Sequence, residues 1–147
     1  MVGSEAFQTM LSAIKEKEPS YNMPTTDSGT NDYWTLAKDY CNKVQNGAHI
    51  PSASDLAKIA RVLYNDTSIS DADEYNDNYS LNWNTNKTAV FAALGIESTA
   101  SHFHLWSDKP DGTEYAYARE FTTSSTHYGY DFPRGNSDFY RVVCISD

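Results

Sequence analysis

The chain lacks several features that mark well-known classes of protein. It has two cysteines in 147 residues and no Cys-x-x-Cys pair, which disfavours zinc ribbons and thioredoxin-like redox sites. No stretch approaches the roughly 18 apolar residues of a membrane-spanning helix. The motifs of serine hydrolases, zinc proteases, phosphate loops and dinucleotide-binding domains do not occur. We therefore predict no catalytic residues and no cofactor.

Positive charge is also scarce. There are 20 acidic against 11 basic residues, a net charge of −9, which repels phosphate backbones and excludes nucleic acid as a partner. Aromatic residues, in contrast, are plentiful: eleven Tyr and three Trp accompany many Ser, Thr and Asn residues. This composition is typical of a recognition surface, because Tyr offers broad contact at low entropic cost. A surface that is simply polar and soluble is the alternative.

The two cysteines lie far apart in the sequence. Cys41 falls in an amphipathic stretch, and Cys144 falls in the last apolar run of the chain. A disulfide between them would close a loop of roughly 100 residues and stabilise the fold by about 4 to 5 kcal/mol in the chain-entropy model. Two unrelated buried thiols are the alternative.

Periodic apolar residues predict short helices in the first two thirds of the chain. The pattern covers residues 4–17, 32–44, 52–63 and 86–94, and Gly47 and Gly95 mark two of the ends. Ser52 precedes Asp55 by three residues, which is the Ser-x-x-acid signature of a helix N-terminus.

Residues 65–84 turn acidic and rich in asparagine, and we predict a long surface loop there. Carboxylates at this density could hold calcium. However, the run has no glycine at the sixth position, and Asn82 stands where a calcium loop requires Glu. A solvated loop is therefore the favoured interpretation of its acidic residues, Asp71, Asp73, Glu74 and Asp77.

After residue 96 the pattern changes to short strands. Residues 102–107 and 114–121 flank Pro110-Asp-Gly112, a tight-turn signal that predicts a β-hairpin. Residues 122–138 have almost no aliphatic side chains, so we predict that they are mostly irregular or form the tip of a hairpin. A final strand is predicted over residues 139–145, and Trp106 is predicted to lie in the core.

Four short sequence motifs, called words here, occur one after another along the chain. Each is weak alone, but together they cover roughly residues 33–147. They are Ala37-Lys-Asp-Tyr-Cys41, Gly47-Ala-His-Ile-Pro-Ser52, Leu105-Trp-Ser107 and Arg141-Val-Val-Cys-Ile145.

These words resemble those of a bacterial branch of the C-type lectin-like domains. The resemblance implies an α+β fold in which N-terminal helices pack on a small antiparallel sheet, with a conserved bridge between Cys41 and Cys144. It implies a C-type lectin-like domain over residues 31–147, preceded by an N-terminal helix and loop over residues 1–30 that could be the end of a truncated anchor. The calcium-binding tripeptides of sugar-binding members do not occur here, so we predict no metal ligands.

The chain also resembles the variable proteins of diversity-generating retroelements. Those proteins use this fold to display hypervariable side chains near the C-terminus. Residues 122–139 are composed largely of the Asn, Tyr, Ser, Asp, His, Thr and Gly set that adenine-directed mutation yields. Ordinary loops have the same composition, which is the alternative.

Polar aromatic residues and arginines gather in the late part of the chain. Exposed aromatic residues beside arginine are typical of binding hot spots, and a segment broken by glycine and proline cannot bury all of them. Local packing is the alternative role for each. The predicted ligand-binding residues are Tyr117, Arg119, His127, Tyr128, Tyr130, Phe132, Arg134, Asn136, Asp138 and Phe139.

The sequence therefore predicts an exported or surface-displayed domain that binds an unknown protein or carbohydrate through its late loops. A pilin-like structural subunit with a lectin-like head is the first alternative, based on the apolar stripe of residues 7–14. The second is a metal-dependent enzyme with the fold of formylglycine-generating enzymes, in which His102 and His104 share a strand face and His127 converges on them.

Overall fold

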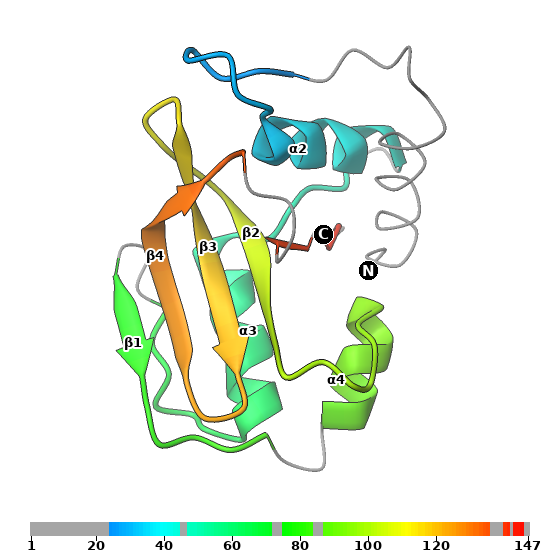
Figure 1. Cartoon of the computed structure of the whole chain (residues 1–147). Helices are drawn as coiled ribbons and strands as arrows, with labels where there is room; N and C mark the ends of the chain where they lie inside the picture. Colours follow the sequence, from blue (N-terminus) through cyan, green and yellow to red (C-terminus); the bar gives the residue numbers. More distant parts are fainter. Residues whose placement is uncertain are drawn as a thin grey trace.

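The protein folds into a five-stranded sheet with helices on both faces (Figure 1). This computed structural model describes residues 24–44, 47–71, 75–83, 87–135, 140–141 and 143–145. The predicted α+β class is confirmed within these ranges. The helices are α2 (Tyr33–Val44), α3 (Ala53–Tyr64) and α4 (Lys87–Leu94), and the strands are β1 (Asn76–Asn78), β2 (His102–Asp111), β3 (Tyr115–Thr122), β4 (Thr126–Pro133) and β5 (Tyr140–Arg141).

The three described helices begin and end where local signals place them. The Asp32 carboxylate accepts the Thr35 backbone N–H at 2.8 Å and caps α2. Ser52 and Asp55 form a reciprocal capping box at the start of α3. Gly95, with φ of 69°, follows α4. These three predicted helices are confirmed, whereas the helix predicted over 4–17 lies outside the described residues.

The strand order is β1-β4-β3-β2-β5. The strands β2, β3 and β4 form an antiparallel meander, and Gly112, with φ of 63°, lies in the predicted turn. The chain end returns so that β5 runs parallel to β2 over two residue pairs. The predicted hairpin is therefore confirmed, and the predicted final strand is shorter than expected.

Two segments predicted to be irregular contain strands instead. β1 lies within the stretch 65–84 and pairs with β4 through Asn76, Asp77 and Asn78. β4 lies within the stretch 122–138, although it has no aliphatic side chain. Thr126 and Tyr128 supply its buried surface instead, because Thr and aromatic residues suit a pleated, half-buried strand as well as aliphatic residues do.

The two faces of the sheet are covered by different helices. On one face, the α3 face, Phe103, Leu105, Phe121 and Tyr128 pack with residues of α3 and α4. On the opposite face, the α2 face, Trp106 packs with residues of α2, which confirms its predicted core position. Figure 1 shows α3 behind the strands and α2 at one end of the sheet, so α2 covers only part of its face.

A disulfide joins α2 to the end of the chain, as predicted. Cys41 and Cys144 are bonded, with their Cα atoms 5.4 Å apart and a sequence separation of 103. Beside the bond, His49 and Ile145 exchange backbone hydrogen bonds of 2.9 and 2.7 Å. The chain end is therefore fixed to the segment between α2 and α3.

The described part of the N-terminal segment contacts the hairpin. The Ser28 backbone N–H and hydroxyl both donate to the Glu114 carboxylate, at 3.0 and 2.7 Å.

Among the described residues, no helix has the length and apolar character that crossing a membrane requires.

Replacing both Cys41 and Cys144 with Ala should lower stability strongly, because the bond closes a loop of 103 residues. The expected loss is about 3 to 5 kcal/mol, measured by denaturant unfolding. A Thr25→Ala and Val62→Ala control pair, which removes exposed side chains, should change stability by about 0.5 kcal/mol or less per site. Equal stability of the cysteine variant and the control would contradict the tether described above.

Candidate functional site

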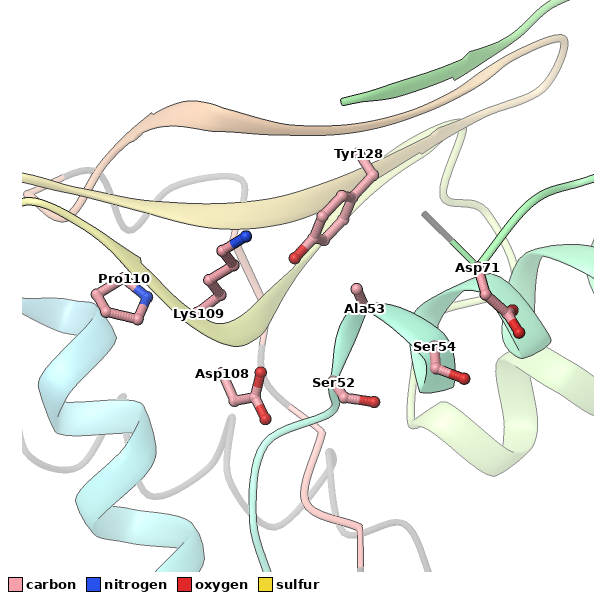
Figure 2. Close-up of a pocket in the computed structure, with 8 residues that line it drawn as sticks. All are labelled: Ser52, Ala53, Ser54, Asp71, Asp108, Lys109, Pro110 and Tyr128. Carbon is pink, nitrogen blue, oxygen red and sulfur yellow. The ribbon is translucent and has the colours of Figure 1, made fainter. Parts of the chain in front are cut away.

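A cleft opens between the N-terminus of α3 and the adjoining end of the sheet (Figure 2). Its volume is about 540 Å³, within the range of small-molecule sites. Figure 2 shows Tyr128 reaching down from the sheet toward Ala53, with Lys109 beside it. The lining residues are Ser52, Ala53, Ser54, Asp71, Asp108, Lys109, Pro110 and Tyr128.

The cleft exists because β2 is irregular where it passes α3. The register between β2 and β3 shifts between Trp106 and Pro110, and such irregularities re-aim side chains. The Asp108 backbone N–H donates to the Pro51 carbonyl at 2.9 Å. This bond fastens β2 to the residue that precedes the α3 cap, so Asp108 and Lys109 line the cleft instead of continuing the ladder.

The buried hydroxyl of Ser107 fixes the floor of the cleft. It donates to the Tyr117 carbonyl at 3.0 Å and lies 3.1 Å from the Tyr128 hydroxyl. The Trp34 indole N–H donates to the Ser107 carbonyl at 2.7 Å. Burial raises the pKa of Tyr128 to about 12, and the hydrogen bond with Ser107 opposes this only in part. The floor is therefore a neutral, immobile phenol.

The walls of the cleft carry both signs of charge. Burial raises the pKa of the Asp108 carboxyl above its ordinary value of 3.8, and Asp55 adds to this, while His49 and Lys38 partly offset it. The Lys109 ammonium lies 4.6 Å from the centre of the Tyr117 ring. Hydrogen-bond donors and acceptors thus surround an aromatic floor.

One of the predicted ligand-binding residues, Tyr128, lines this cleft, and two others, Tyr117 and Tyr130, lie next to it without lining the cleft. Tyr117 stacks on Tyr128 with ring centres 5.4 Å apart, and Tyr130 lies 5.8 Å from Tyr117 on its other side. Tyr130 is 47% exposed, but Tyr128 is fully buried. Tyr128 was expected to be an exposed contact, and that expectation is wrong because β4 turns this side chain into the α3 face.

Both predicted arginines are buried as well. Arg134 pairs with the buried Asp32 at 3.2 Å and donates to the Tyr115 and Gly112 carbonyls at 2.9 and 2.8 Å. It therefore clamps the β2–β3 turn to the start of α2. Its expected exposure is wrong, because this network satisfies the guanidinium inside the fold.

Arg119 is buried with far fewer contacts. Its Nη1 donates to the Thr126 hydroxyl at 3.2 Å, and its guanidinium lies 5.6 Å from the Tyr128 ring centre. Nε and Nη2 have no hydrogen-bond partner. Burial lowers the pKa of Arg119 to about 10, although Tyr128 and Tyr64 partly oppose this. Arg119, predicted to bind ligand, is placed by β3 on the α3 face, where it is buried.

The other predicted ligand-binding residues lie elsewhere. His127 and Phe132 lie on the α2 face, opposite the cleft, with ring centres 5.9 Å apart. Asn136, Asp138 and Phe139 lie outside the described residues.

Two of the three histidines proposed for a metal enzyme pair with carboxylates instead. His104 Nε2 lies 3.2 Å from Glu120, and His127 Nδ1 pairs with Asp77. Within the described ranges, no group of three or more His, Cys, Asp or Glu side chains could hold a metal ion.

Sequence reasoning missed the polar wall of the cleft. Ser54, Asp108 and Lys109 were assigned no role, although Pro110 within a strand-like run signals an irregular or edge position. That signal predicts the irregularity but not the helix terminus that faces it.

Asp108→Asn should raise the melting temperature at neutral pH. The folded-state pKa of Asp108 is raised, so ionisation costs stability as the pH rises through and above 3.8, the ordinary value. Well below that value the two proteins should melt alike, because both side chains are neutral. A lower melting temperature of the variant at neutral pH would contradict the raised pKa of Asp108, and Asp27→Asn, which removes the same charge outside the cleft lining, is the matched control.

The two buried arginines should respond oppositely to replacement by Met. Arg134→Met leaves Asp32 buried without its partner and should cost about 3 to 5 kcal/mol. Arg119→Met removes a desolvated charge with two unbonded nitrogens, so stability should stay level or rise. Denaturant unfolding measures both. A large loss in Arg119→Met would show that its charge is compensated in the fold.

No known protein-family model, curated protein or solved structure matches this chain. The chemistry of the cleft and the two faces of the sheet are therefore the basis on which a function can be proposed.

Proposed function

We propose that this protein is an exported or surface-displayed, C-type-lectin-like recognition domain that binds a carbohydrate in the cleft beside α3. The observation that carries this proposal is the arrangement of hydroxyl, carboxyl and ammonium groups around a fixed tyrosine floor. A sugar presents many hydroxyl groups that both donate and accept hydrogen bonds, together with apolar C–H faces. The cleft offers partners for both, because its walls are polar and its lining residue Lys109 lies over the Tyr117 ring, next to the exposed ring of Tyr130.

The fold supports the lectin-like part of the proposal. Two helices come first, the β2–β4 meander follows, and a disulfide joins the first of these helices to the chain end. This order agrees with the one that the sequence words imply. The disulfide also supports export, since such bonds persist in oxidising compartments.

Binding without chemistry fits the same groups. Asp108 is a carboxyl with a raised pKa. However, Asp108, Lys109 and the N-terminus of α3 provide no nucleophile and base within hydrogen-bond reach of each other. If a retroelement diversifies the late segment, the fold confines useful variation to outward side chains such as Tyr130, because Thr126, Tyr128 and Arg134 are buried.

Lys109→Met should weaken carbohydrate binding by about 10-fold to 100-fold, because a hydrogen bond to a charged group is worth about 1.5 to 3 kcal/mol. The probe is the strongest binder from a panel of mono- and disaccharides, titrated by calorimetry with and without a calcium chelator. The chelator should leave the affinity unchanged.

Tyr79→Ala is the matched control, because Tyr79 is 69% exposed and contacts Asp77, away from the cleft. It should bind the sugar as the unaltered protein does. Equal affinity of the Lys109 variant would remove the cleft as the site, and a panel without any binder would remove carbohydrate as the ligand class.

A further inference from the structure

A second surface lies on the α2 face of the sheet, where four titratable side chains form a row across four strands. The pairs in register are Asp77 with His127, His127 with Glu120, and Glu120 with His104. Partners in register share a face. Carboxylates and imidazoles therefore alternate from β1 to β2, and we call these four residues the acid–histidine row.

Within the row, each histidine pairs directly with one carboxylate. His127 Nδ1 pairs with Asp77, and His104 Nε2 lies 3.2 Å from Glu120. Phe132 lies between the two imidazoles, with ring centres 5.2 Å from His104 and 5.9 Å from His127. Within the row His104 is buried, whereas the side chains of Glu120, His127 and Asp77 are 35%, 24% and 18% exposed.

Glycine at position 129 makes room for this arrangement. A Cβ atom there would lie 2.4 Å from Nε2 of His127, closer than real Cβ contacts allow. The imidazole therefore lies over the β4 backbone at Gly129. A side chain at this position would push His127 away from its place in the row.

Two exposed tyrosines flank the Asp77 end of the row. Tyr75 and Tyr79 are 58% and 69% exposed, the two largest values among the exposed large hydrophobic residues of the described chain. Their hydroxyls both donate to one oxygen of Asp77, at 2.5 and 3.1 Å. Tyr75 also packs edge-on against His127 at 5.1 Å. The rings are therefore held in place although water surrounds them, which lowers the entropic cost of binding a partner.

The charge of this surface is negative. Burial acts to raise the pKa of Asp77, but hydrogen bonds from Tyr75, His127 and Tyr79 outweigh it and hold the pKa below 3.8. Histidine rings are the side chains that face the Asp77 and Glu120 carboxylates within the described ranges, where no Lys or Arg pairs with either. The whole chain carries −9. Fixed aromatic rings beside an ionised carboxylate attract ammonium and guanidinium groups through their faces and through charge.

We propose that Tyr75, Tyr79 and the acid–histidine row form a docking surface for a basic protein segment that presents Lys or Arg side chains. Charge complementarity selects this partner. The tyrosine faces receive the cationic head group, and the carboxylates of the row supply the attraction. This surface lies on the face of the sheet opposite the cleft, so it is independent of the proposed carbohydrate site.

The test uses oligo-arginine and oligo-lysine peptides as probes, with an oligo-glutamate peptide of equal length as the negative probe. Backbone amide signals in NMR should shift around residues 75–79 and 127 with the basic peptides only. Raising the salt concentration should weaken the shifts. Shifts spread over the whole chain, equal shifts with the acidic peptide, or no shift at millimolar peptide would each overturn the proposal.

Variants separate a specific surface from general attraction to an acidic protein. The double variant Tyr75→Ala with Tyr79→Ala keeps the net charge and should weaken peptide binding by about 30-fold, the effect of a hot spot of about 2 kcal/mol. Asp77→Asn should weaken it similarly, whereas Asp27→Asn, which removes the same charge at an exposed site, should not. Equal effects of the two Asp variants would overturn the proposal.

Two further controls address folding and the cleft. Tyr75→Phe with Tyr79→Phe keeps both rings and should preserve most of the binding, so a loss in this variant would show that the hydroxyls, rather than the faces, make the contact and would overturn the proposed mode. Melting curves identify any variant that unfolds. Lys109→Met should bind the peptides normally, because Lys109 lines the cleft on the other face.

Discussion

The tether between α2 and the end of the chain is the constraint on which the other features depend. β5 pairs with β2 over two residue pairs, too short a ladder to be stable alone. The Cys41–Cys144 bond and the His49–Ile145 bridge hold this end in place. β2 is thereby enclosed by β3, β5 and a helix layer on each face. A strand fixed from all these sides can tolerate an irregularity after Trp106, and that irregularity opens the cleft.

Local signals in the sequence were enough to predict the helices and the first hairpin. Ser52 and Asp55 satisfy the backbone donors at the start of α3 within one turn, and Gly112 adopts the positive φ that the turn requires. Such interactions involve residues that are close in the sequence, so a short stretch of sequence is enough to determine these structures. The cysteine pair was also recognised, because two cysteines in separate apolar segments leave few other roles.

The strands β1 and β4 could not be predicted in this way, because β1 is stabilised by pairing with β4, and β4 by pairing with β1 and β3. Asn76 and Asn78 have low strand propensity, and only the register with Tyr128 and Thr126 makes them a strand. The exposure of individual side chains could not be predicted for the same reason. Tyr128 and Tyr130 have similar sequence surroundings, yet one is buried and the other is 47% exposed, since the sheet decides which side is covered.

Because β4 is pleated, neighbouring residues of this strand lie on different surfaces of the sheet. His127 belongs to the acid–histidine row, and the next residue, Tyr128, forms the floor of the cleft on the opposite face. Because adjacent side chains in a strand point to opposite faces, a substitution at one position alters one surface and leaves the other in place. Gly129 is the exception, since its missing side chain is what allows His127 to lie across the strand. The residues of the two proposed binding surfaces can therefore change independently of each other. Both surfaces nevertheless depend on the pairing of β3 with β4, because they share these strands.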